Sequence, residues 1–167
     1  MRIHANELFS SMIKKLTILL LLCLPAFIQG QDSPKTDSLL KQLQLARKDT
    51  SQVLLLYAIA EEYENSTPAK AMKYIGMGEA LSKSLGYETG VWKAYRMYSY
   101  VYSYQSKFDS VIFYNKLVLD IARQRKDSFN IGVSLFNIGI GFRFKSELDS
   151  AVQYTLDGAR ILDGKGY

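Results

Sequence analysis

The chain has 167 residues, of which 48% are hydrophobic and 22% charged, and its formal net charge at neutral pH is +5. Its single histidine and single cysteine, His4 and Cys23, both lie within the segment 1–30. The rest of the sequence therefore argues against disulfide frameworks, zinc sites and nucleophilic triads that need a histidine base. The mild, interspersed positive charge argues against a nucleic-acid partner.

Residues 1–30 have the pattern of a secretory signal peptide. Lys14 and Lys15 precede a nearly uninterrupted apolar stretch over residues 16–28, and the small Gly30 follows. A basic start, an apolar middle of about 7–15 residues and a small residue at the cleavage site are typical of such signals. A membrane-spanning helix needs roughly 20 apolar residues. We therefore expect export to the periplasm or cell envelope of a bacterium, with an uncleaved anchor as the alternative.

The segment 31–48 is predicted to be a polar lead-in followed by one short helix. Asp37 can cap this helix, whose apolar residues share one face. The residues of this face are Leu39, Leu40, Leu43 and Ala46.

Removal of the expected signal leaves a segment, 31–167, whose length suits one ordinary domain. The whole chain has 21 basic and 16 acidic side chains. Without Arg2, Lys14, Lys15 and Glu7 of the signal, these numbers fall to 18 and 15, which gives a net charge of +3. The expected mature chain is therefore only mildly basic.

A first helix pair is predicted over residues 49–87. Its first helix begins at Asp49, and apolar residues follow at helical spacing. They are Val53, Leu56, Ile59, Ala60 and Tyr63. Thr67 can cap the second helix, and Pro68 suits its first position because the N–H that proline lacks is not needed there. Gly86 can end the pair in a left-handed conformation.

The second pair, residues 88–126, contains a segment with mixed signals. Tyr98, Tyr100, Tyr102 and Tyr104 alternate with smaller residues, and tyrosine favours strands. A helical pattern competes, and it recurs in the third pair, residues 127–167. Its residues are Val91, Tyr95, Tyr98 and Tyr102, and their counterparts are Ile131, Leu135, Ile138 and Phe142. Because a pattern found twice outweighs local propensity, we predict a helix in both places.

The same arrangement returns about every 40 residues, which indicates a repeat architecture. The matching segments are Ala71-Met72-Lys73-Tyr74, Val111-Ile112-Phe113-Tyr114 and Ala151-Val152-Gln153-Tyr154. In the third pair, large residues at Leu135, Ile138 and Phe142 surround the small Gly139, and the small Ala151 follows in the next helix. A small residue at a helix crossing lets two backbones approach while large residues fill the space around it.

These residues resemble the tetratricopeptide repeat family over about residues 50–167, although the period is longer than the roughly 34 residues usual there. The resemblance implies an all-α fold. It would be an α-solenoid of three stacked helix-turn-helix repeats, residues 49–87, 88–126 and 127–167, behind a short leading helix. It also implies a non-catalytic module that binds a protein or peptide and uses no cofactor.

In this family the inner groove is lined by particular positions of each first helix. In this sequence those positions are Lys93, Arg96, Tyr100 and Ser103 in the second repeat, and Val133, Phe136, Ile140 and Arg143 in the third. Aromatic, apolar and cationic side chains together suit a peptide with an apolar anchor and an acidic group. The alternative is that a further repeat or a partner covers Phe136 and Ile140 and that the cations are ordinary surface residues.

Two other motifs have simpler explanations than chemistry. Gly139-Ile140-Gly141 lies within a helical pattern with no strand before it, so helix packing explains it better than a dinucleotide loop. The carboxylates of Glu61, Glu62 and Glu64 follow one another at a helix end, where we expect them to be solvated. We predict no catalytic and no metal-binding residue.

The last helix, about residues 147–163, is apolar on a face that solenoids usually close with a polar capping helix. We expect either self-association through this end or a longer chain. The whole arrangement also resembles exported repeat regions at the N-terminus of bacterial membrane-bound regulators. The alternative function is therefore the sensory region of a transmembrane histidine kinase or helix-turn-helix regulator, with membrane contact only in such a longer chain.

Overall fold

A computed structural model describes residues 12, 14–15 and 33–164 of the chain. The expected signal segment therefore lies almost wholly outside the described residues, as does the C-terminal Gly166-Tyr167. The described residues from Ser38 onward belong to one compact unit. The described residues contain α-helices and no strand, and no helix among them is long and apolar enough to cross a membrane.

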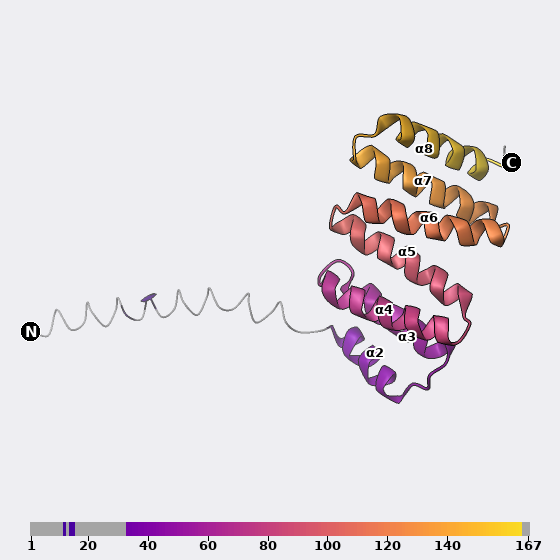
Figure 1. The fold of residues 1–167 in the computed structure, drawn as a ribbon. Helices are drawn as coiled ribbons and strands as arrows, with labels where there is room; N and C mark the ends of the chain where they lie inside the picture. The colour runs from indigo at the N-terminus through magenta and orange to yellow at the C-terminus, as the bar shows by residue number, and fades with distance from the viewer. Residues whose placement is uncertain (1–11, 13, 16–32, 165–167) are drawn as a thin grey trace, which may run out of the picture. The chain divides into compact units, whose positions relative to one another are not determined.

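The helices after α2 stack in chain order, each packing against the next (Figure 1). Their bounds are α3 (Thr50–Tyr63), α4 (Pro68–Ser84), α5 (Glu88–Tyr104), α6 (Phe108–Gln124), α7 (Ser128–Phe144) and α8 (Leu148–Leu162). This arrangement of successive helices confirms the predicted all-α fold and is consistent with an α-solenoid. The tyrosine-rich segment of α5 is helical, so the recurring helical pattern outweighs the strand propensity of tyrosine.

Two predicted helix starts differ in detail from the structure. Helix α2 (Pro34–Leu45) begins before Asp37, which lies inside its first turn. Ser33 caps it instead, because the Ser33 hydroxyl oxygen accepts a hydrogen bond of 3.1 Å from the Thr36 N–H. Thr67 precedes α4 as predicted, but its side chain makes no capping hydrogen bond. Pro68 at the next position provides the helix start, because its fixed φ already suits a helix.

Other predicted helix ends are confirmed. Asp49 caps α3 by accepting hydrogen bonds from the N–H groups of Ser51 and Gln52, at 2.9 and 3.2 Å. Gly86 ends α4 with a φ of +63°. The helices from α4 onward start at regular intervals, at positions 68, 88, 108, 128 and 148, so a single short turn is used repeatedly.

The turns after α5, α6 and α7 also each contain one residue in the left-handed backbone conformation, and none of these three residues is glycine. They are Ser106, Lys126 and Ser146, with φ of 55°, 54° and 62°. In each turn the following N–H reaches back to the helix and satisfies one of its last carbonyls. These bonds are Lys107 N to Tyr102 O at 3.0 Å, Asp127 N to Ala122 O at 2.9 Å and Glu147 N to Phe142 O at 3.0 Å. This bonding pattern ends each helix and fixes the direction of the next one.

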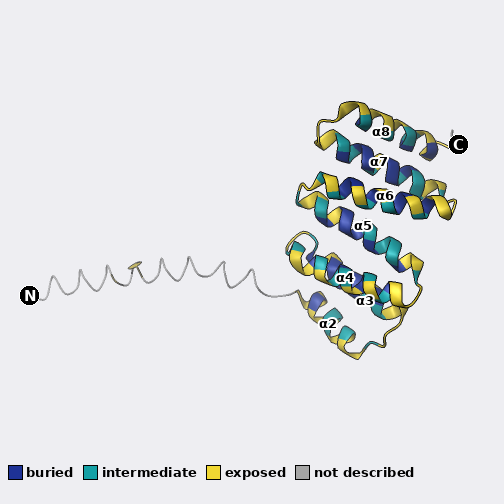
Figure 2. Ribbon diagram, viewed as in Figure 1, coloured by how far each residue is buried: buried dark blue, intermediate teal, exposed yellow. Residues whose placement is uncertain are grey.

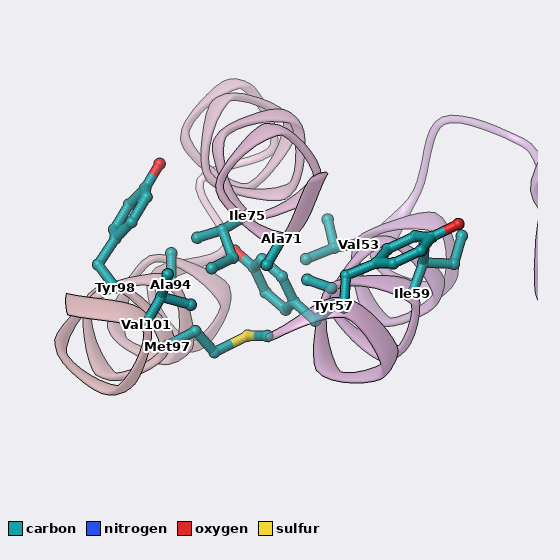
Figure 3. Packing of buried hydrophobic residues seen from close by; sticks show 11 residues of the cluster. Val53, Tyr57, Ile59, Ala71, Ile75, Ala94, Met97, Tyr98 and Val101 are labelled. Atoms are coloured by element: carbon teal, nitrogen blue, oxygen red, sulfur yellow. The ribbon is translucent and has the colours of Figure 1, made fainter. Parts of the chain in front are cut away.

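Helices α3, α4 and α5 share the first hydrophobic core (Figures 2 and 3). Its buried residues are Val53, Tyr57, Ile59, Ala60, Tyr63, Ala71, Ile75, Ala94, Met97, Tyr98 and Val101. The ring of Tyr57 lies among them (Figure 3), and its hydroxyl donates to the Gly90 carbonyl at 2.8 Å. Leu39, Leu40 and Leu43 of α2 pack against this core, as their shared face predicts.

Three tyrosines of the recurring helical pattern in α5 gather around one tyrosine of α6. The rings of Tyr95, Tyr98 and Tyr102 lie 6.1, 4.8 and 5.6 Å from the ring of Tyr114. These separations are typical of favourable aromatic pairs. The tyrosines therefore join α5 to α6 by side-chain packing.

A second hydrophobic core joins α6, α7 and α8, and its buried residues are Ile112, Leu119, Leu135, Ile138 and Ile161. Here glycines bring the helix backbones together. A Cβ atom on Gly139 would lie 2.9 Å from the Thr155 nitrogen, and one on Gly158 would lie 2.7 Å from the Gly132 carbonyl oxygen. Helix packing thus accounts for Gly139, as the sequence predicts.

Candidate functional site

A row of side chains along α5 lines an open cavity of about 530 Å³ beside α3. Trp92, Arg96, Tyr100 and Tyr104 are spaced four residues apart, so they follow one another along one side of the helix. The remaining lining residues are Glu61, Glu64, Lys93 and Met97. We call this site the α5 groove. The predicted residues Lys93, Arg96 and Tyr100 all contribute to it.

The charges of the α5 groove are unevenly paired. Lys93 Nζ lies 3.1 Å from the Glu61 carboxylate, so these two neutralise each other. The Arg96 guanidinium lies over the Trp92 ring, with its Cζ 4.7 Å from the ring centroid, and no carboxylate of the described residues pairs with it. Arg96 is therefore held by stacking on an aromatic face and remains available to an anionic group. At the other side of the groove, burial, together with the neighbouring Glu61 charge, raises the pKa of the Glu64 carboxyl.

A narrower hollow continues from Arg96 and Tyr100 towards α6 and α7. It is lined by the apolar Val133 and by polar residues such as Asn137. At its base the Asn115 amide donates to the Ser99 hydroxyl and to the Val111 carbonyl. Asn137 makes no side-chain hydrogen bond to the described residues, so its amide can contact a ligand. The volume of this polar hollow is about 10 Å³, so it is a small indentation beside the α5 groove.

Phe136, Ile140 and Arg143 lie elsewhere, in an apolar cavity of about 390 Å³ between α7 and α8. Its other lining residues are Gly139, Leu148, Ala151, Val152, Thr155 and Leu156. The structure thus divides the predicted groove residues between two cavities. Ser103 lines neither of them, and its hydroxyl donates to the Tyr100 carbonyl at 2.7 Å.

Sequence reasoning missed five residues of the α5 groove: Glu61, Glu64, Trp92, Met97 and Tyr104. A signal was available for two of them, because Trp92 precedes Arg96 by four residues and Tyr104 follows Tyr100 by four. The two glutamates gave no such signal. Their place in the groove depends on where α3 lies beside α5. The sequence predicts only that they lie at a solvated helix end.

No group of histidine, cysteine or acidic residues among the described residues could hold a metal ion. Comparison with protein-family models finds no matching family, and comparisons with curated proteins and with solved structures find no significant match.

Proposed function

We propose that this chain is a non-catalytic interaction module of the tetratricopeptide type, with three helix-turn-helix repeats, that binds a protein or peptide segment in the α5 groove. The observation that carries the proposal is the row Trp92, Arg96, Tyr100 and Tyr104, which borders an open cavity. Tyr100 and Tyr104 are 45% and 58% exposed, far more than packing in the core would leave them. Exposed aromatic residues beside an unpaired arginine are the side chains most often dominant in protein recognition.

The chemistry of the groove favours an acidic peptide with a flat or apolar side chain. Of the two cations in the groove, Arg96 is the one that no carboxylate of the described residues pairs with. Its planar guanidinium suits bidentate contact with a ligand carboxylate. The rings of Tyr100 and Tyr104 offer apolar area at low entropic cost, because each has only two side-chain torsions. Asn137 can add a hydrogen bond to the ligand backbone.

A peptide selection tests this proposal. Dodecapeptides selected from a randomised displayed library on the full chain should be enriched in aspartate or glutamate next to an apolar residue. Replacement of Arg96 and Tyr100 together by alanine should weaken the binding of the selected peptides at least about tenfold, measured by calorimetry. The matched control replaces Arg123 and Phe113, an arginine and an exposed aromatic of α6. Equal binding by both double variants would remove the groove assignment.

We also propose that the module acts outside the cytoplasm, because residues 1–30 carry the signal-peptide pattern. Expression of the whole gene in a bacterium, followed by intact-mass measurement of the periplasmic fraction, tests it. The expected product begins at Gln31. A cytoplasmic product that retains residues 1–30 would contradict export.

A further inference from the structure

The outer face of α8 is apolar and exposed. Leu148, Val152 and Leu156 follow one another at intervals of four residues, with 64%, 58% and 50% of their surfaces exposed. Together with Phe136 of α7 they border the cavity of about 390 Å³. We call Leu148, Asp149, Val152 and Leu156 the α8 face. Such a continuous apolar face on a helix is unusual unless another element covers it.

The structure contains a template for what covers such a face, because α6 has the same register one repeat earlier and receives α7. The Phe108 ring stacks on the Phe144 ring, with centroids 4.6 Å apart and planes 7° from parallel. Ile112 fills the space beside Gly141, where a Cβ atom would lie 2.6 Å from its Cγ1. The helix received by α6 is therefore defined by a glycine and by an aromatic residue three positions later.

An ion pair completes this template. Lys145 Nζ, directly after the aromatic residue of α7, lies 2.7 Å from the Asp109 carboxylate of α6. One repeat later, the positions of Phe108, Asp109 and Ile112 are occupied by Leu148, Asp149 and Val152. The α8 face thus repeats both the apolar positions and the acidic position of α6. Asp149 forms no ion pair with any described residue, so its charge is free for an incoming base.

We propose that the α8 face binds one amphipathic helix supplied by another polypeptide. That helix presents a small residue to Val152, a large apolar or aromatic residue three positions later to Leu148, and a lysine or arginine directly after it to Asp149. Close approach at the small residue gives the packing, and the base gives the orientation. This surface is separate from the α5 groove, and the inference does not depend on the function proposed for that groove.

A second copy of this chain fits the α8 face less well than a different polypeptide. Among the described helices, a glycine or alanine followed by a large apolar residue at the third position and a base at the fourth occurs three times. Gly141 already packs on Ile112 of α6, and the open side of Gly139 is filled by Thr155. The third case starts at Ala69, but its apolar residue, Met72, packs against the first core. The α8 helix itself offers no such combination. A copy could supply the required helix only by unfolding its own stack.

The probe for this site is a synthetic peptide of residues 127–147, which contains the α7 sequence and carries a fluorophore at its N-terminus. We expect saturable binding of this peptide to the full chain by fluorescence anisotropy. The Val152→Asp variant should weaken it more than about tenfold, because a carboxylate would be buried unpaired under the helix. The matched control is Leu54→Asp on α3, where Leu54 is 49% exposed, and this change should leave the affinity unaltered.

A charge exchange shows whether the peptide adopts the α7 register. Asp149→Lys should weaken binding about two- to fivefold, as expected for an exposed ion pair, and a peptide with Lys145→Glu should recover the loss on that variant. The charge exchange also tests the inference if the Val152→Asp variant does not fold.

The inference is overturned if the peptide does not bind saturably, if Leu54→Asp weakens peptide binding equally, or if the exchanged charges fail to restore affinity. Light scattering that shows a dimer dissociated by Val152→Asp would likewise overturn it, because the occupant would then be a second copy.

Discussion

The two halves of the helical stack are packed by different means. In the first half, α3 to α5, large side chains fill the space between helices, and Tyr57 is buried there with its hydroxyl bonded to the Gly90 carbonyl. In the second half, α6 to α8, the backbones of α7 and α8 approach at Gly139 and Gly158. One half is therefore held by side-chain volume, and the other by the absence of side chains.

The difference decides how each half tolerates change. Glycines of the first half face side chains: a Cβ atom on Gly78 would meet the Tyr57 ring at 2.3 Å. Gly158 faces backbone on two sides, the Gly132 carbonyl oxygen at 2.7 Å and the Phe136 nitrogen at 2.8 Å. A side chain can rotate away from a new methyl group, whereas a helix backbone moves only as a unit. We expect the first half to be sensitive to loss of volume and the second to its addition.

Loss of volume at Tyr57 should have the largest effect. Tyr57→Ala removes a fully buried ring, and we expect the free energy of unfolding to fall by about 3–5 kcal/mol. Guanidinium denaturation followed by circular dichroism measures this change. Tyr100→Ala is the matched control, because Tyr100 is exposed, and it should change stability by less than about 0.5 kcal/mol. Comparable losses in the two variants would show that Tyr57 does not carry the first core.

Addition of one methyl group to the second half should have the next largest effect. Gly158→Ala forces α7 and α8 apart, and we expect a loss of about 1–3 kcal/mol in the free energy of unfolding. Gly76→Ala on α4 is the control, since its new methyl group would meet only the Tyr98 hydroxyl oxygen, at 3.4 Å. Alanine favours helix over glycine, so this control should be neutral or stabilising by up to about 1 kcal/mol. A stabilising Gly158→Ala would refute the close approach of the two backbones.

Alkaline pH should act on the first half through its buried tyrosines. Burial raises the pKa of Tyr57 from 10.0 to about 12, and burial beside Glu79 raises that of Tyr98. Below pH 10 the tyrosine is protonated in both the folded and the unfolded state, so the stability that its burial gives is fully present. As the pH rises from 10 towards 12, the unfolded state loses the proton first, and this stability is lost. We expect the loss at Tyr57 to be on the order of 1–2 kcal/mol.

Urea denaturation at pH 8 and above pH 10 measures this loss. The Tyr57→Phe variant should be the less stable protein at pH 8, because it lacks the hydrogen bond to Gly90. It should nevertheless lose less stability than the natural protein as the pH rises. Parallel pH profiles for the two proteins would contradict the role of Tyr57.

The sequence predicts the helices well because their apolar patterns recur, and the recurrence resolves the ambiguous tyrosines of α5. It predicts the turns less well. Gly86 signals a left-handed residue, whereas Ser106, Lys126 and Ser146 do not, since their residue types rarely adopt positive φ. Their conformation follows from backbone hydrogen bonds to the preceding helix and from the regular spacing of the helices. Neither these hydrogen bonds nor the helix spacing can be predicted from the residue type at the turn.

The candidate groove shows the same limit at the level of side chains. Arg96 and Tyr100 are predicted from the groove positions that the resemblance to tetratricopeptide repeats implies, and both line the α5 groove. Trp92 and Tyr104 extend the same helix face, and they could have been predicted from their four-residue spacing to Arg96 and Tyr100. Glu61 joins them only because α3 crosses α5 at a distance that lets its carboxylate reach Lys93. Such contacts depend on helix packing, which no short motif specifies.

The smallest predicted effect concerns the aspartate that caps a helix in each half. Asp49 caps α3, and Asp127 caps α7 by accepting hydrogen bonds from the Asn130 side chain at 2.6 Å and the Asn130 N–H at 3.0 Å. The hydrogen bond from the Asn130 side chain, followed by that from its N–H, lowers the pKa of the Asp127 carboxyl. Asp127→Ala should lower the free energy of unfolding at pH 7 by about 1 kcal/mol.

Because the folded pKa of Asp127 is lowered, its contribution is present above the ordinary pKa of an aspartate and is lost as the pH falls through the folded value. The stability gap between the natural protein and Asp127→Ala should therefore narrow in acid, as measured by urea denaturation at neutral and at strongly acidic pH. Asp127→Asn keeps a capping oxygen that does not titrate, so its gap to Asp127→Ala should persist across the same range. If the ionised carboxylate contributes nothing beyond any capping oxygen, all three proteins will lose stability in parallel, and the cap of α7 will prove to act by geometry alone.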